Sequence, residues 1–260
     1  MARTRTESRL ERILDAALLS FLENGYRGAT LQDVAERAEV SVGSVYSYVA
    51  DKEALFELVL RAALREPPPD LESLPFQSTE GSALVSWVWE RFGEIAHFPT
   101  LDAAAARPAP AKPLSELEQV LREVWAWQSR YWRAIELIER CARDWPDLHM
   151  LYYKQFRRGV FAKAAGLFQR RMAEGVIRAY PDASRPDPDH ALRVVVEAIA
   201  FFAMHRHVRP DSDYLDEDVS RETVIGMLVA AFTPAEAPPA TDAGVRDGAS
   251  PRRSLQRKRS

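Results

Sequence analysis

Small and hydroxyl-bearing residues are concentrated in one short segment near the amino end of the chain. From Ser41 to Tyr48 the sequence reads SVGSVYSY, which leaves Val45 as the single obvious core residue. Hydroxyl groups donate and accept hydrogen bonds, so a short helix of this composition suits contact with phosphates and base edges. A helix of about two turns also fits lengthwise into the major groove of DNA. The alternative, a plain hairpin in a helical bundle, would need a wider apolar face.

A second group of aromatic and polar residues lies in the middle of the chain. Trp125 and Trp132 are seven residues apart and therefore share one helical face, and Gln128 interrupts an apolar stripe between them. The pattern predicts an aromatic-walled pocket for a small molecule, with ordinary core packing as the alternative. The residues expected to line this pocket are Trp87, Trp125, Gln128, Trp132, Tyr152, Gln155 and Phe156.

Catalytic and metal chemistry find little support in the sequence. Cys141 is the single cysteine, so an intrachain disulfide is impossible and a reducing cytoplasm fits. His205 and His207 would point in different directions on a helix, so we expect no metal site. We find no phosphate-binding glycine loop and no nucleophile elbow, and we expect no cofactor. An enzyme with a site inside a helical bundle stays only as an alternative. No apolar run approaches the roughly 20 residues that a membrane span needs.

Apolar spacing and capping residues predict the helices that position the hydroxyl-rich segment. An apolar stripe over residues 10–22 predicts a first helix, and Gly25 predicts its end. Thr30 and Asp33 have the spacing of a capping box and predict the start of a short second helix. A third helix over 41–48 and a longer one over 51–65 follow. Two short helices braced by longer ones form a helix-turn-helix.

Prolines and composition divide the chain further. We predict a helix-turn-helix domain over 1–50 with a linking helix at 51–65, a helical sensor and dimerisation domain over 66–233, and a disordered basic tail over 234–260. The fold class is therefore all-α, with about nine helices. In the second domain we expect helices at about 79–97, 114–143, 147–174, 188–208 and 216–232. The helix at 188–208 is apolar on nearly every side and must be covered on two faces.

The segment from Ile13 to Val59 reads ILDAALLSFLENGYRGATLQDVAERAEVSVGSVYSYVADKEALFELV. It resembles the N-terminal signature of the TetR family of transcriptional regulators in order, spacing and residue type, while the rest of the chain matches that family only in helical layout. Two positions depart from the family pattern. Glu39 stands where the turn usually has glycine, so either the turn is strained or its geometry differs slightly. Val49 replaces a usual phenylalanine after the third helix, so we expect looser packing at Val49.

The resemblance implies a ligand-responsive DNA-binding regulator. It implies a repressor that leaves a palindromic operator when a small hydrophobic or aromatic effector binds the second domain, and a homodimer that pairs through the helices at about 188–208 and 216–232. A DNA-binding adaptor without a ligand, and a monomer with an internal core helix, are the alternatives. The first 65 residues carry nine Arg and Lys against ten Asp and Glu, so the grip on DNA depends on local cations. The implied DNA-contacting residues are Thr30, Gln32, Ser41, Val42, Gly43, Ser44, Tyr46, Tyr48 and Lys52.

Overall fold

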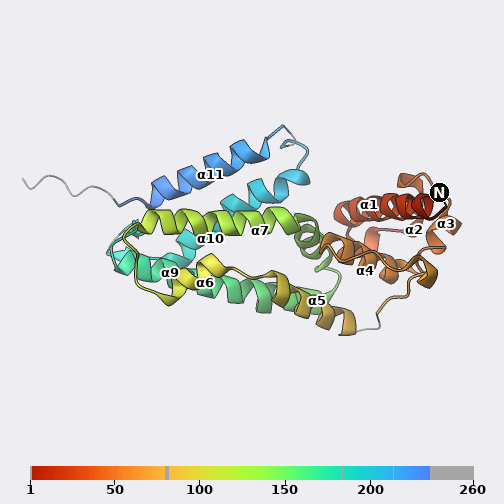
Figure 1. The fold of residues 1–260 in the computed structure, drawn as a ribbon, viewed down its shortest axis with the longest axis horizontal. Coiled ribbons are helices and arrows are strands. Elements are labelled where there is room, and N and C mark those ends of the chain that lie inside the picture. Colours follow the sequence, from red (N-terminus) through yellow and green to blue (C-terminus); the bar gives the residue numbers. More distant parts are fainter. Residues whose placement is uncertain (1, 80–81, 183, 213, 235–260) are drawn as a thin grey trace, which may run out of the picture.

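The computed structural model describes residues 2–79, 82–182, 184–212 and 214–234 of the 260-residue chain. The all-α prediction is confirmed: apart from one hairpin of two-residue strands, β1 (Pro181–Asp182) and β2 (Arg185–Pro186), the named elements of these residues are helices. The predicted tail, except for its first residue, lies outside the described residues. Figure 1 shows an elongated molecule with a small group of helices at the amino end and a longer bundle beside it.

Four helices build the amino-terminal group. They are α1 (Ala2–Gly28), α2 (Leu31–Arg37), α3 (Val42–Tyr46) and α4 (Lys52–Ala63). Gly25 has a φ of 73° and interrupts α1, as its place in the sequence predicts, because glycine adopts this conformation without a Cβ clash. The chain leaves α4 through Arg65, at a φ of 63°, and the run of prolines beginning at Pro67 prevents the helix from continuing.

The remaining helices form the longer bundle. They are α5 (Ser82–Ile95), α6 (Pro99–Ala106), α7 (Pro113–Cys141), α8 (Pro146–His149), a π-helix (Met150–Arg157), α9 (Arg158–Ala173), α10 (Pro188–Ala203) and α11 (Glu217–Phe232). The described residues thus hold eleven α-helices, where the sequence predicts about nine. Pro99 starts the unpredicted α6, because proline at the first helical position lacks only an amide that has no helical partner. The π-helix divides the helix expected at 147–174.

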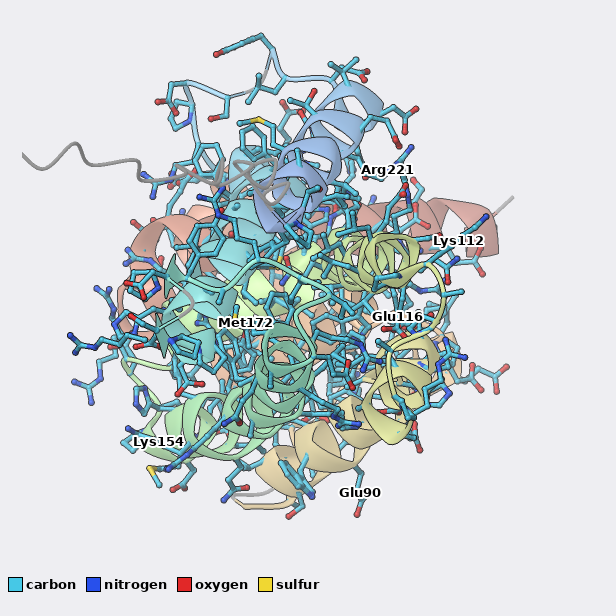
Figure 2. The ribbon with its side chains drawn as sticks, turned by 90° about the vertical axis from the view of Figure 1, so that its left-hand side faces the viewer. Glu90, Lys112, Glu116, Lys154, Met172 and Arg221 are labelled. Carbon is cyan, nitrogen blue, oxygen red and sulfur yellow. The ribbon has the colours of Figure 1, made fainter. Side chains whose placement is uncertain are left out.

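Helix α7 is the central element of the molecule. It packs against α1 and α4 at one end and against α6, α10 and α11 along its length. Figure 1 shows it running through the bundle from the amino-terminal group to the far end. In the end-on view of Figure 2, α11 lies on one side of the bundle and α5 on the opposite side, with Met172 near the middle. The division into two domains at residue 50 or 65 stays a prediction, because one continuous apolar core joins both groups of helices.

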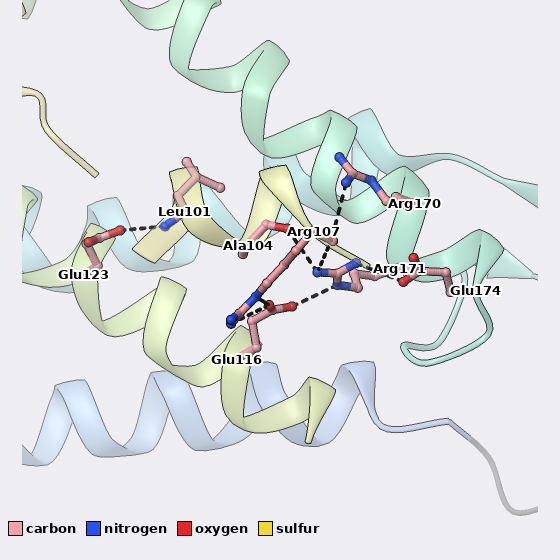
Figure 3. Close-up of polar contacts among 8 residues, drawn as sticks. All are labelled: Leu101, Ala104, Arg107, Glu116, Glu123, Arg170, Arg171 and Glu174. Atoms are coloured by element: carbon pink, nitrogen blue, oxygen red, sulfur yellow. Dashed lines mark hydrogen bonds and ion pairs between the residues drawn. The ribbon is translucent and has the colours of Figure 1, made fainter. Parts of the chain in front are cut away.

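A buried ion pair fixes the far end of this bundle. Arg171 on α9 and Glu116 on α7 are 3% and 6% exposed, and the Arg171 Nε atom lies 2.8 Å from Glu116 Oε2. The same guanidinium donates to the carbonyl oxygens of Ala104 and Arg107 at the end of α6 and to Glu174 (Figure 3). One side chain therefore joins three helices, and its charge is balanced inside the protein.

We expect Arg171→Met to lower the free energy of unfolding by about 3–5 kcal/mol, because it leaves the buried Glu116 carboxylate without its main partner. Urea denaturation followed by circular dichroism measures this loss. The neighbouring Arg170, which donates one 3.4 Å bond to the Arg107 carbonyl, provides the control, and Arg170→Met should cost about 1 kcal/mol. Equal losses in the two variants would contradict this account.

Candidate nucleic-acid interface and adjoining cavity

Side-chain caps fix where the two short helices α2 and α3 begin. Thr30 and Asp33 form the predicted capping box: Thr30 Oγ1 accepts from the Asp33 amide at 3.1 Å, and Asp33 Oδ2 accepts from the Thr30 amide at 3.2 Å. Ser41 caps α3 by accepting from the Ser44 amide at 3.1 Å. These caps satisfy amides that have no helical partner, so α2 and α3 begin at fixed residues.

The outer face of α2 and α3 is polar and accessible. Val45 is the only residue of α3 that is fully buried. Tyr46 is 50% exposed, and Val42 and Ser44 are half-buried. On this face the hydroxyls of Ser41 and Ser44 lie 2.9 Å apart. The other predicted contact residues that are exposed are Thr30, Gln32, Ser41 and Gly43.

Two of the predicted contact residues point elsewhere. Tyr48 is only 4% exposed and belongs to the apolar core, because the chain turns after α3 and carries its ring inward together with Val49. We therefore remove Tyr48 from the surface set. The Lys52 ammonium donates to the carbonyl oxygens of Arg27 and Ala29, at 3.3 and 3.2 Å. In this structure Lys52 thus holds the end of α1.

In the turn between α2 and α3, Glu39 adopts the left-handed conformation that favours glycine. Glu39 adopts a φ of 55°, in the left-handed region where a Cβ atom is strained. The looser packing expected at Val49 is not found. Val49 is fully buried and pairs with Phe76 as a parallel bridge, and the Phe76 amide donates to the Tyr48 carbonyl at 2.8 Å. The phenylalanine that packs here comes from a distant segment of the chain.

Replacement of Glu39 by glycine should raise the free energy of unfolding by about 0.5–1 kcal/mol, because it relieves the left-handed strain. Glu36, an exposed residue inside α2, is the matched control. Glycine at position 36 should lower stability by about 1 kcal/mol. Thermal and urea unfolding would show the two opposite signs; a loss of stability in Glu39→Gly would contradict the strain.

The carboxyl end of α7 and the turn after it are hydrogen-bonded to the carboxyl end of α1. Arg140 donates to the carbonyl oxygens of Leu22 and Glu23, at 3.0 and 2.6 Å. Asp144, just beyond α7, accepts from the Arg27 amide at 3.0 Å, and a Cβ atom on Gly25 would lie 3.1 Å from its carboxylate. We call these contacts the α1–α7 clamp. They join Arg140 of α7 and Asp144 of the turn after it to residues 22–27 of α1.

An aromatic cluster extends the clamp to α4. The rings of Tyr26, Phe56 and Trp145 have centroids 5.3–5.5 Å apart. Burial raises the pKa of the Tyr26 hydroxyl to about 12, with Glu53 and Asp51 adding to the shift. Tyr26 therefore stays neutral near pH 7. Together the clamp and this cluster connect the bundle directly to the helices that present α3.

A cavity of about 150 Å³ lies between α6, α7, the π-helix, α9 and α10. Of the predicted pocket residues, Gln128, Tyr152 and Phe156 line it. In the π-helix each amide bonds five residues back, and this wider turn brings Tyr152, Phe156 and Arg157 to the cavity together. Other lining residues include Phe98, Leu101, Val120, Val124, Trp127, Phe161, Leu192, Val195 and Ile199.

Four predicted pocket residues lie outside the cavity lining. Trp87 stacks under the Arg61 guanidinium at 4.2 Å, and Trp132 stacks on His207 with centroids 4.4 Å apart. Trp125 is buried in the core, and Gln155 is exposed. The seven-residue spacing of Trp125 and Trp132 predicts one shared helical face, but neither residue lines the cavity.

Sequence reasoning missed the charged end of the cavity. Glu139, Arg157, Glu197 and His205 lie there, and His205 contacts Glu136. The hydrogen bond that His205 donates to the Glu136 carboxylate raises the pKa of His205 above its ordinary value, and burial raises the pKa of Glu139. The signal that could have found this end is the pair of carboxylates at 136 and 139 within the apolar stripe of α7.

Comparison with known proteins agrees with this geometry. Residues 13–59 match the model of the bacterial regulatory proteins of the TetR family. The chain is 42% identical over 60 residues to the HTH-type transcriptional regulator BetI of Paraburkholderia xenovorans, which covers 23% of this chain and 31% of that protein. It is 34% identical over 114 residues to BetI of Burkholderia thailandensis, covering 36% and 58%. Residues 13–59 therefore have the sequence of a TetR-family N-terminal domain.

Two solved structures extend the likeness in fold to the bundle. The ketosteroid transcriptional regulator KstR2 of Mycobacterium tuberculosis superposes with a TM-score of 0.52 at 17% identity, over 87% of this chain and 96% of that one. A TetR-family regulator of Streptomyces coelicolor gives 0.50 at 22%, over 85% and 89%. The chain spans only about a third to three fifths of the BetI sequences. The BetI proteins and both solved structures are described as transcriptional regulators.

No helix among the described residues is long and apolar enough to cross a membrane. No group of three or more His, Cys, Asp and Glu side chains among them is arranged to hold a metal ion.

Proposed function

We propose that this protein is a ligand-responsive transcriptional repressor that binds a palindromic operator as a homodimer. The observation that carries the proposal is the outer face of α2 and α3, where capped helix ends present hydroxyls and the half-exposed Tyr46 ring. In a major groove, hydroxyls bond phosphates or base edges, and Val42 offers an apolar contact for a thymine methyl. Thr30, Gln32, Ser41, Gly43 and Ser44 complete the proposed contact surface.

The outer faces of α10 and α11 support pairing with a second copy. Val194, Val219 and Met227 are each about two-thirds exposed, which is unusual for large apolar side chains. Next to Val194 lies a hollow of about 530 Å³, which Leu228 and Phe232 also line. A two-fold axis here would bury both faces as a four-helix interface. It would also set the two α3 helices one DNA turn apart, roughly 34–36 Å.

The cavity and the α1–α7 clamp support a response to a small molecule. Helix α7 carries Gln128 and Glu139 in the cavity wall and Arg140 in the clamp. A molecule that binds one arrangement of α7 more tightly shifts the population of α1 and α3 positions by its difference in affinity. The bound molecule would thus act on DNA affinity through α7.

A gel-shift titration with the DNA upstream of the protein's own gene tests the proposal. We expect a shift at nanomolar protein that weakens at higher salt, since basic residues release counterions from phosphates. A protein that does not prefer this DNA to a random duplex would contradict the regulator function. A shift that no cavity-sized molecule changes would indicate a DNA-binding adaptor.

A further inference from the structure

One buried polar atom in the cavity wall has no partner. Gln128 is 7% exposed and lines the cavity, and its Oε1 atom accepts no hydrogen bond from any residue in the described part of the chain. A carbonyl oxygen that leaves water without gaining a donor destabilises the folded protein. Buried polar atoms nearly always have a partner, and a molecule bound in the cavity could supply the donor that this oxygen lacks.

The size of the cavity limits what that molecule is. Its volume of about 150 Å³ is well below the roughly 300–1,000 Å³ of sites for drug-sized ligands. Apolar protein cavities of roughly 150 Å³ take up benzene. Aromatic side chains form part of this wall: the Trp127 ring lies 5.8 Å from Phe156 and 5.4 Å from Phe98, measured between centroids. These dimensions and walls suit a single ring.

The charges at the other end of the cavity are balanced by one another. The Arg157 guanidinium donates to Glu197 at 2.8 Å and pairs with Glu139 at 3.5 Å, and Glu139 also accepts from the neutral Tyr152 hydroxyl at 3.0 Å. The His205 ring contacts the Glu136 carboxylate. A charged ligand would lose its hydration and find no free counter-charge among these groups. The unpaired group is the neutral amide of Gln128, which favours a neutral ligand.

We propose that the cavity binds a neutral single-ring molecule with a hydroxyl or amino donor, the chemistry of phenols and anilines, and that Gln128 Oε1 accepts this donor. The inference rests on the proposed function, in which the cavity is the effector site. It makes Gln128 the residue that determines specificity, because the apolar wall alone accepts any ring of this size.

Phenol, toluene and benzoate test the proposal by isothermal titration calorimetry with the full-length protein and no DNA. Phenol and toluene have nearly the same size but differ in the hydroxyl, and benzoate adds a charge. We expect phenol to bind at least about tenfold more tightly than toluene, because toluene leaves the buried oxygen unpaired, and benzoate to bind weakest. Equal affinities for phenol and toluene, tighter binding of benzoate, or no binding of phenol would overturn the proposal.

Gln128→Leu is the decisive variant. It removes the unpaired polar group while keeping most of the volume, so we expect a protein at least as stable as the wild type. Its preference for phenol over toluene should disappear or reverse. Gln155→Leu makes the same change at an exposed glutamine outside the cavity lining and should keep the wild-type preference. Retained phenol preference in Gln128→Leu would overturn the assigned role.

This test and the test of the regulator function can fail separately. A protein that prefers phenol but does not shift upstream DNA contradicts the regulator function and leaves the ligand chemistry standing. A protein that shifts its DNA but binds phenol and toluene equally contradicts only the ligand chemistry.

Discussion

Tyr46→Ala is expected to weaken operator binding by at least about 30-fold. Tyr46 is the largest exposed side chain of α3, and half of its surface is free in the monomer. A lost direct contact in a DNA groove costs about 1–3 kcal/mol, and a homodimer loses it in both half-sites. The sum of at least about 2 kcal/mol corresponds to this factor. Fluorescence anisotropy with labelled upstream DNA measures the change.

Two further variants separate the contact from general effects. Trp89→Ala removes an aromatic residue of similar exposure, 46%, from α5 in the other group of helices, and should leave the affinity unchanged. Tyr46→Phe keeps the ring and removes only the hydroxyl, so an intermediate loss would indicate a hydrogen bond to DNA. If Tyr46→Ala binds upstream DNA as the wild type does while remaining a folded dimer, α3 is not the recognition helix.

Met227→Asp is expected to convert the homodimer to a monomer. Met227 is 69% exposed on α11, and the proposed two-fold axis would bury it together with its mate. The substitution then places two carboxylates in an apolar interface without partners, and burying unpaired charge costs several kcal/mol. Light scattering after size-exclusion chromatography measures the mass, and DNA affinity should fall because one half-site is lost.

Met150→Asp provides the matched control for this charge. Met150 is 50% exposed at the start of the π-helix, which packs against α5, α8 and α9 and not against α11. The variant should keep the mass and the DNA affinity of the wild type. A Met227→Asp protein that stays dimeric at micromolar concentration would place the interface elsewhere.

Local signals made the amino-terminal helices predictable. The capping box of Thr30 and Asp33, the cap at Ser41 and the break at Gly25 each depend on residues a few positions apart, and each is present in the structure. The exposed polar face of α3 followed from composition. Even the strained turn at Glu39 could be anticipated, because the position requires a conformation that glycine adopts at no cost.

The direction of Lys52 and the lining of the cavity depend on contacts between distant segments, so the sequence did not predict them. Lys52 points toward the end of α1 because its ammonium donates to the carbonyl oxygens of Arg27 and Ala29. These partners lie more than 20 residues away in the sequence, so no local pattern predicts the contact. Three of the seven predicted pocket residues line the cavity, whereas the tryptophan in its lining, Trp127, was not among those predicted. Tyr131 departs from helical geometry within α7, with φ −111° and ψ 17°, and the π-helix opposite has a different period, so the faces of both helices differ from those of regular ones.

The break at Tyr131 also has a mechanical consequence. It lies between Gln128 in the cavity wall and Arg140 in the clamp, so α7 can act as a lever with its fulcrum near Tyr131. Nine residues of helix give an arm of about 13 Å, so a bend of about 5° displaces Arg140 by about 1 Å. In the proposed homodimer, two-fold symmetry repeats this displacement in the other protomer. A small molecule that fits one bend of α7 would then set the distance between the two α3 helices.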